Sequence, residues 1–292
     1  MTCYLSTSCF PRMPLADAIA ACRGLGRRRI EVSAPHPWQP IEEMEAVLAT
    51  TAADGVLLSL HNYFPAPPDP IVLNVASPDP AELAQSRALI AHAARLARAA
   101  RAPVYGVHAG YLGKATPSDG DDFQFADPGD SLAAAQRRAI ATLAAVLPLF
   151  APQTRLLVEN LFPSKSRRHS LMCDIEELAE YLDQLPQLGW LLDLGHLNVS
   201  ANLLGFDRQA YLDHALARFG GRLREVHISE NDGQTDQHLP IGQDSWQLGA
   251  LARIKMVPTD DDEPRIYCVE CRRADRDELI GSLDRVDAAL AA

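Results

Sequence analysis

The chain has few cysteines, six in 292 residues, far below the density of a small domain held together by disulfides. We therefore expect reduced thiols. Cys268 and Cys271 have the C-x-x-C spacing, but they lie on an expected strand rather than at a helix start. No second pair completes a zinc site, so a redox or thiolate-metal role is only a minor alternative.

The chain also lacks a run of about 18 apolar residues, and its N-terminus lacks a basic segment followed by a long apolar one. We therefore expect no membrane span, no signal peptide and a cytoplasmic location. Positive charge is scarce as well, because 27 Lys and Arg face 38 Asp and Glu, a net charge of -11. This balance disfavours nucleic acid and favours a small molecule as the partner, and it leaves the oligomeric state open.

Apolar residues are plentiful, at 47%, so the chain can bury a large core, and one domain over residues 1–292 is the simplest expectation. Short apolar runs alternate with helical patterns. The expected strands are 3–8, 29–33, 56–60, 104–108 and four that close near 159, 193, 227 and 270; the expected helices are 15–25, 41–53, 81–100, 132–150, 175–185, 208–219 and 275–290, with a shorter element after 244. Eight such repeats predict an α/β fold of the (β/α)8 TIM-barrel type, with a doubly wound open sheet as the alternative.

Side chains that bind metals recur where these strands end. Six of them close a strand: His61, His108, Glu159, Asp193, His227 and Glu270. Three more follow nearby: His196, Asp236 and His238. A parallel barrel directs the C-terminal ends of its strands to one rim, so we expect these nine side chains to form a metal site there. A single histidine at a strand end is usually an ordinary polar residue, and the shared phase of the set is what favours metal binding.

The ligand types limit the choice of metal. Imidazole and carboxylate together suit zinc, manganese, iron or cobalt. Four carboxylates carry a formal charge of -4, so one dication would leave -2 in a partly buried site. We therefore expect more than one ion per chain. Asp236 and His238 lie between Gly233 and Gly242 and could instead belong to a loop that closes over substrate.

Three connections, residues 62–80, 109–130 and 160–173, are longer than a barrel needs. The last one carries Lys165, Arg167 and Arg168 directly after Glu159. A solvated charged loop is the simplest interpretation of this run. Its position at the rim also predicts that these three cations, with Asn160, bind an anionic group of a substrate.

Several segments resemble a known family. LVEN, LLDLGH, the strand that ends in His227, TDQHLPIG and VEC are similar to the xylose isomerase-like barrels, which include sugar (phosphate) isomerases and epimerases and the endonuclease IV-type AP endonuclease family 2 enzymes. The resemblance implies that Glu159, Asp193, His227 and Glu270 are metal ligands. It also implies that the other five match the extra ligands of a three-zinc cluster. The opening strand CYLSTSCF departs from the endonuclease pattern, and no basic and aromatic loops that clasp DNA are evident.

Three functions follow from these observations. The first is a metal-dependent sugar or sugar-phosphate isomerase or epimerase, in which Glu159 or Glu270 moves a proton and His196 is a further catalytic candidate. The second is a multinuclear phosphoester hydrolase, and the third is a non-catalytic metal- or sugar-binding barrel. Weaker candidates for supporting or substrate contacts are Glu31, Glu230, Asn160 and Asn198.

Overall fold

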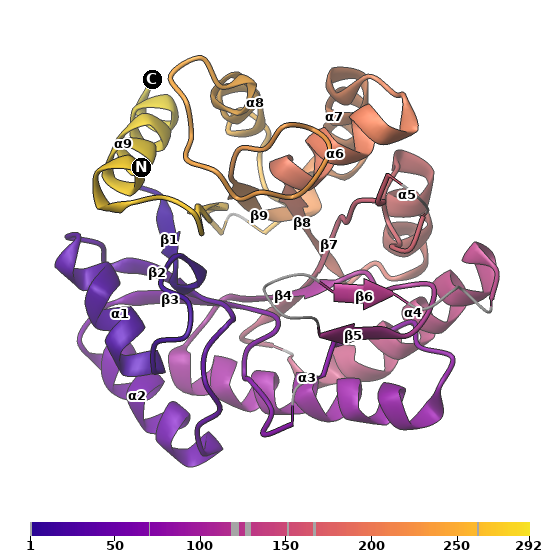
Figure 1. The fold of residues 1–292 in the computed structure, drawn as a ribbon, viewed down its shortest axis with the longest axis horizontal. Coiled ribbons are helices and arrows are strands. Elements are labelled where there is room, and N and C mark those ends of the chain that lie inside the picture. The colour runs from indigo at the N-terminus through magenta and orange to yellow at the C-terminus, as the bar shows by residue number, and fades with distance from the viewer. Residues whose placement is uncertain are drawn as a thin grey trace.

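The computed structural model describes residues 2–69, 71–117, 123–125, 130–150, 152–165, 168–261 and 263–292. Parallel strands close into a barrel in the order β1-β10-β9-β8-β7-β4-β3-β2 (Figure 1). Their bounds are β1 Tyr4–Ser6, β2 Arg29–Val32, β3 Leu57–His61, β4 Val104–His108, β7 Arg155–Glu159, β8 Gly189–Asp193, β9 Leu223–Ile228 and β10 Ile266–Val269. Each neighbouring pair is parallel, so the C-terminal ends of the strands meet at one mouth. The predicted (β/α)8 barrel is confirmed.

Helices cover the outside of the barrel. They are α1 Leu15–Gly24, α2 Ile41–Ala53, α3 Pro80–Ala100, α4 Leu132–Val146, α5 Ile175–Gln184, α6 Leu194–Leu204, α7 Arg208–Phe219, α8 Trp246–Ile254 and α9 Arg276–Ala291. Short 3-10 turns occupy Thr7–Cys9, Leu147–Leu149 and Gly220–Arg222. Side-chain caps explain several helix starts: Asp275, for example, caps α9 in a capping box with Glu278.

Three details differ from the sequence-based expectation. The α6 helix was not expected, because LGHLNVSANLL lacks a strong amphipathic pattern; it is largely buried and begins at the end of β8. The expected strand over 3–8 ends at Ser6 and gives way to a 3-10 turn. The long connection 109–130 contains a two-stranded antiparallel ribbon of β5 (Ala115–Pro117) and β6 (Phe123–Phe125). The shorter element expected after residue 244 is the helix α8.

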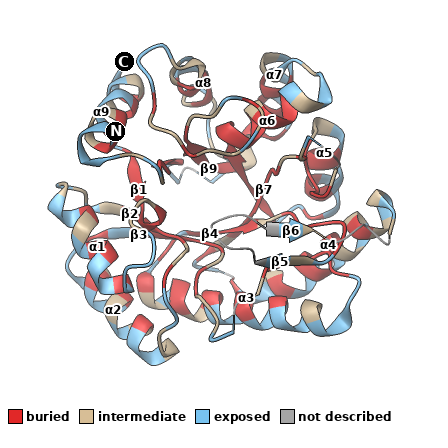
Figure 2. Ribbon diagram, viewed as in Figure 1, coloured by how far each residue is buried: buried red, intermediate tan, exposed pale blue. Residues whose placement is uncertain are grey.

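Most of the core lies between the barrel and its helices. Figure 2 shows buried strands inside helices that are buried on one face and exposed on the other. Trp190 and Tyr181 are among the largest fully buried side chains, and burial of a leucine-sized side chain contributes about 1.5–3 kcal/mol. The stretch Leu132–Leu149 is long and apolar enough to cross a membrane by length and composition alone. In the barrel, α4 buries Ala135, Ala139 and Leu143 on one face.

The inner face of the barrel changes from apolar to polar toward the mouth. A small cluster of buried side chains lies low in the barrel: Tyr4, Val104, Leu157, Leu191, Ile266 and Cys268. Successive side chains on a strand point to opposite faces, so the residue two positions later points inward again, nearer the mouth. Leu157 is thus followed by Glu159, Leu191 by Asp193 and Cys268 by Glu270. The strand periodicity itself therefore places these three carboxylates above apolar side chains of the same strands.

Gly106 makes room for one of the predicted ligands. A Cβ atom at this position of β4 would lie 2.7 Å from Cδ2 of His61 and 2.7 Å from Cδ1 of Leu191. Contacts that short do not occur, so any larger residue would displace the His61 ring. Glycine at 106 is therefore a packing requirement of the site above it.

Candidate metal centre

The structure brings all nine predicted ligands into one buried cluster at the mouth of the barrel. His61, His108, Glu159 and Asp193 are the last residues of β3, β4, β7 and β8. His227 lies near the end of β9, and Glu270 directly follows β10. The nine form three adjoining groups: His61, His108 and Glu159; Asp193, His227 and Glu270; and His196, Asp236 and His238.

Glu159 lies between two sets of histidines. Its Oε2 atom is 2.7 Å from Nε2 of His61 and 3.3 Å from Nε2 of His108. Its Oε1 atom is 3.3 Å from Nδ1 of His196 and 3.9 Å from Nδ1 of His227. The two carboxylate oxygens therefore face different histidines, a placement that suits a carboxylate shared between two cations.

Asp193, His227 and Glu270 form the second group. The Nδ1 atom of His227 is 3.4 Å from Oε2 of Glu270 and 3.9 Å from Oδ2 of Asp193. Asp193 is also the N-cap of α6, because its Oδ1 accepts a hydrogen bond from the backbone N–H of His196 at 2.7 Å. This cap explains the Asp193-x-x-His196 spacing and leaves Oδ2 directed toward the cluster.

His196, Asp236 and His238 form the third group. The Oδ2 atom of Asp236 is 2.6 Å from Nε2 of His238 and 3.5 Å from Nε2 of His196. Asp236 and His238 lie on the β9–α8 connection, which is held back by an antiparallel bridge between Glu230 and Leu239. His238 has a φ of 49°, a conformation that is uncommon outside glycine and is found where surrounding structure or function demands it.

Unpartnered polar atoms show that this donor set fits metal ions. Among the described residues, Oδ2 of Asp193, Nδ1 of His227 and Oδ1 of Asp236 are buried and make no hydrogen bond. A buried polar atom without a partner costs about 1–3 kcal/mol, so three in one cluster need a compensating partner. Imidazole nitrogens and carboxylate oxygens that converge in this way are the ligands of first-row dications.

The electrostatics of the cluster also call for positive charge. Burial opposes the ionised form of Glu159, but His61 and His108 outweigh it and hold the pKa of this carboxyl far below its usual range. Burial likewise disfavours protonated His196, yet Asp193 and Asp236 raise its pKa to about 10. For His108 burial prevails over Glu159 and lowers the pKa to about 3, so this imidazole is neutral. Protons on some histidines thus offset the carboxylates when metal is absent.

Residues around the ligands hold them in place. Asn160 bonds the backbone of Asp193 on both sides: its Nδ2 donates to the carbonyl at 3.0 Å, and its Oδ1 accepts from the N–H at 2.8 Å. Nδ1 of His196 lies 2.8 Å from the Asn160 carbonyl oxygen. The Asn160 side chain is therefore occupied within the site, and its contact with substrate stays a prediction.

Several supporting residues were not singled out from the sequence. Ser8 donates to Oε1 of Glu270 at 2.9 Å, and Arg272 donates to the same oxygen at 2.8 Å. The hydroxyls of Tyr63 and Tyr111 lie 3.1 and 2.8 Å from Nδ1 of His108. Only Arg272 carried a possible signal, as a cation two residues after a ligand. The tyrosines and Ser8 are brought in by loops and by the turn after β1.

The predicted anion-binding loop is only partly described. Arg167 lies outside the described residues, and Lys165 is exposed. Arg168 donates to Asp174 at 3.1 Å and also to Glu177, so its guanidinium is engaged in ion pairs at the start of α5. Substrate binding by these three residues stays a prediction.

The thiols of Cys268 and Cys271 are buried, and burial raises the pKa of Cys271 to about 12, so neither is a ready thiolate.

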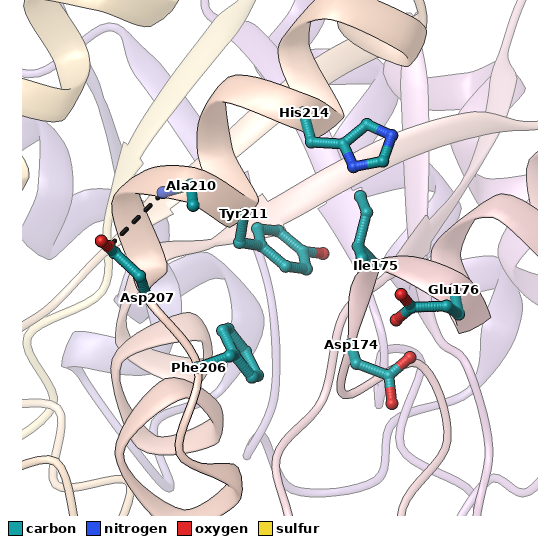
Figure 3. Close-up of a pocket in the computed structure, with 8 residues that line it drawn as sticks. All are labelled: Asp174, Ile175, Glu176, Phe206, Asp207, Ala210, Tyr211 and His214. Atoms are coloured by element: carbon teal, nitrogen blue, oxygen red, sulfur yellow. Dashed lines mark hydrogen bonds between the residues drawn. The ribbon is translucent and has the colours of Figure 1, made fainter.

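Two cavities formed by described residues are lined by none of the nine predicted ligands. One, of about 250 Å³, lies between the start of α5 and α7 (Figure 3). The other, of about 660 Å³, is an open polar groove along α6 and the β9–α8 connection. The cluster itself is closely packed, with His61, Glu159 and His227 at most 2% exposed.

Residues 17–259 match the family model described as xylose isomerase-like TIM barrel, of the AP endonuclease 2 type. The chain belongs to this family. The sequence resemblance found above is therefore confirmed. No curated protein is a significant match to the chain.

Solved structures with the xylose isomerase-like barrel fold include sugar epimerases and an endonuclease. A D-tagatose 3-epimerase-like protein is 17% identical, with a TM-score of 0.75 over 100% of this chain and 97% of that one. D-psicose 3-epimerase from Clostridium cellulolyticum is 13% identical, with a TM-score of 0.69 over 99% of each chain. Endonuclease IV from Thermus thermophilus is 19% identical, with a TM-score of 0.59 over 99% of this chain and 98% of that one. At these identities the likeness establishes the fold.

Proposed function

We propose that this chain is a divalent-metal-dependent isomerase or epimerase of a small sugar-like molecule. The observation that carries the proposal is the placement of Glu159 and Glu270. They come from the ends of β7 and β10, the strands on either side of β8 and β9, which carry Asp193 and His227. Two carboxylates thus approach the Asp193–His227 pair from two sides, as is needed to remove a proton from a carbon and return it elsewhere.

Each residue has a definite task in this proposal. Glu159, Asp193, His227 and Glu270 would hold one ion, and His61, His108, His196, Asp236 and His238 would complete a centre with further ions. A bound zinc, manganese, iron or cobalt ion would polarise a substrate carbonyl and stabilise the negative charge that develops beside it. Glu159 and Glu270 are the acid–base candidates, and His196 can hold a proton beside Asp236. Epimerases with this fold support the proposal by analogy.

The substrate should be small, because the centre is buried and the loops over it are close. Lys165, Arg167, Arg168 and Asn160 stay proposed contacts for an anionic group. With Arg168 paired to Asp174 and Glu177, an uncharged sugar fits this conformation better than a sugar phosphate. The closely packed mouth and the net charge of -11 both argue against nucleic acid as the substrate.

A second function is favoured by one observation, the two-sided placement of Glu159 between separate histidine pairs. Two dications would neutralise the four carboxylates, which suits an uncharged substrate. Three dications would leave a surplus of +2, which suits an anionic phosphoester and a metal-activated hydroxide. A multinuclear phosphoester hydrolase is therefore the alternative, and the number of ions per chain separates the two.

The test combines metal counting with turnover. Chelated protein is reloaded separately with zinc, manganese, iron and cobalt, and the ions per chain are counted by elemental mass spectrometry. Each form is incubated with a panel of ketoses and ketose phosphates in D2O, and with bis(p-nitrophenyl) phosphate. Metal-dependent incorporation of deuterium at a substrate carbon, together with an isomer or epimer as product, is the expected result.

Glu159→Gln and Glu270→Gln should each reduce the rate of deuterium incorporation at least 100-fold, because a positioned acid or base typically contributes a factor of about that size. Glu225→Gln, a change at another buried glutamate of the barrel, is the matched control and should retain activity. Diester cleavage that tracks metal content, without any isomer or epimer, would establish the hydrolase instead. Tight metal binding with neither reaction would leave a non-catalytic barrel.

A further inference from the structure

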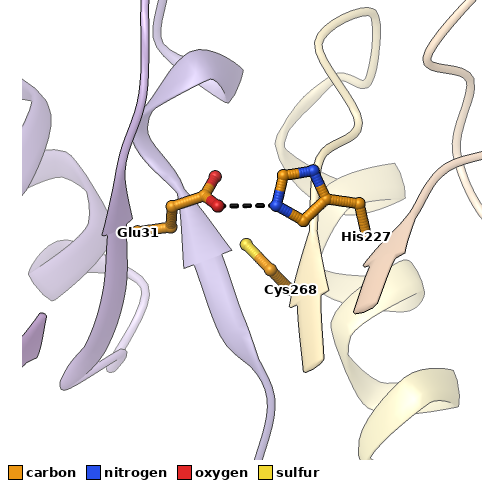
Figure 4. A group of neighbouring side chains, drawn as sticks. All are labelled: Glu31, His227 and Cys268. Atoms are coloured by element: carbon orange, nitrogen blue, oxygen red, sulfur yellow. Dashed lines mark hydrogen bonds and ion pairs between the residues drawn. The ribbon is translucent and has the colours of Figure 1, made fainter. Parts of the chain in front are cut away.

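Beneath the candidate metal centre, a carboxylate on the far side of the barrel contacts one of the ligands. Glu31 lies on β2 and His227 on β9, and both are fully buried. Oε2 of Glu31 is 2.6 Å from Nε2 of His227 (Figure 4). Burying a carboxylate is costly unless a partner compensates it, and among the described residues the other oxygen of Glu31 makes no hydrogen bond. The His227 ring is therefore the compensating partner of Glu31.

This contact fixes which nitrogen of His227 carries the proton. A neutral imidazole donates through one nitrogen and accepts, or binds metal, through the other. A carboxylate only accepts, so Nε2 carries the hydrogen and donates it to Glu31. In the neutral ring Nδ1 then keeps its lone pair; this atom lies 3.4 Å from Oε2 of Glu270 and has no hydrogen-bond partner among the described residues. The free lone pair thus points at the Asp193–Glu270 side of the cluster.

We propose that Glu31 is a positioning residue for the metal centre: it holds the His227 ring, fixes its tautomer and directs Nδ1 toward the ion. The inference rests on the metal centre of the proposed function and adds a residue that touches neither ion nor substrate. Carboxylates that accept the second N–H of a ligand histidine make it a stronger donor, and their loss weakens metal binding about 10- to 100-fold.

Cys268 offers a competing explanation for the same contact. Its thiol on β10 lies with Glu31 and His227 in a group whose possible ligand atoms are within 4.8 Å of one another (Figure 4). An ion held there would use Nε2 of His227, the nitrogen that the proposal assigns to the proton. The protonation state of Nε2 in the metal-loaded protein therefore separates the two explanations.

Glu225 provides a matched control for Glu31. It is also fully buried, lies two residues before His227 on β9, and thus shares the inner face of the barrel. Its Oε1 accepts from the Ser59 hydroxyl at 3.1 Å rather than from an imidazole. Glu31→Gln and Glu225→Gln therefore make the same substitution at fully buried positions inside the barrel, and only the first removes a direct contact with a predicted ligand.

The experiment measures metal affinity by competition with a chromophoric chelator, using zinc and cobalt, for the full-length wild type and both variants. Glu31→Gln should bind about 10- to 100-fold more weakly and shift the visible spectrum of the cobalt form, whereas Glu225→Gln should match the wild type. Equal affinities and spectra for Glu31→Gln and the wild type, or equal losses in both variants, would overturn the inference. A wild type that binds no metal would instead overturn the proposed function.

A measurement on the wild type covers the case in which Glu31→Gln does not fold. Two-dimensional 1H–15N NMR of the zinc-loaded protein with 15N-labelled histidine reports the tautomer of each ring. His227, assigned with a His227→Gln variant, should carry its proton on Nε2 and the metal on Nδ1. The reverse arrangement, or a metal on Nε2, would refute the positioning role of Glu31.

Discussion

Replacing Glu159 by glutamine should remove metal from two positions at once. In the structure, Oε2 of Glu159 faces His61 and His108, while Oε1 faces His196 and His227. A neutral amide cannot bridge two dications, because it offers one oxygen and carries no charge. The change therefore affects two ion positions, although it alters a single side chain.

The magnitude follows from the burial of the carboxylate, which is 1% exposed. Removing one partner from a buried charged group costs about 3–5 kcal/mol. Since about 1.4 kcal/mol corresponds to tenfold in affinity, each ion should bind roughly 10² to 10⁴ times more weakly. At a free metal concentration that just saturates the wild type, Glu159→Gln should lose two ions per chain.

Metal counting after equilibration in a metal buffer checks this expectation. Asp236→Asn is the informative comparison, because Asp236 pairs with His196 and His238 and its loss should cost a single ion. Glu225→Gln should keep the full complement. If Glu159→Gln loses no more metal than Asp236→Asn, Glu159 does not bridge two ions.

Four further predictions concern pH and the charged loop. The pKa of His196 is raised to about 10 in the metal-free protein, so metal binding near pH 7 should release a proton from this residue. Calorimetry in buffers of different ionisation enthalpy measures the number of protons released, and His196→Asn should reduce that number. The same raised pKa stabilises the metal-free fold fully below about pH 6.5 and progressively less as the pH rises through about 10, so denaturant titrations should show a smaller alkaline loss for His196→Asn than for the wild type. Arg168→Gln should lower the free energy of unfolding by about 1.5–3 kcal/mol, because it leaves the buried Glu177 without its cation. Lys165→Glu should raise KM for an anionic substrate only; an unchanged KM would remove Lys165 from substrate binding.

The convergence of the strand-end side chains was predictable because its signal is local. Each of His61, His108, Glu159 and Asp193 closes a short apolar run, and parallel strands share one direction. The α6 helix was not predicted from the sequence, because its stability comes from burial and from the Asp193 cap rather than from an amphipathic pattern. The ion pairs of Arg168 were not predicted either, because Asp174 and Glu177 become its neighbours only when the loop folds back on α5.

The sequence by itself determined the barrel, its family and the set of nine ligand-type residues, because strand period, crossover connections and residue chemistry are written along the chain. Only the tertiary structure decided how those nine divide. It placed Glu159 between two histidine pairs, closed the third group through the β9–α8 connection, and brought Glu31 from β2 across the barrel to His227. These pairings join residues that are up to 196 positions apart. Their distances depend on the closure of the whole barrel, which no local pattern specifies.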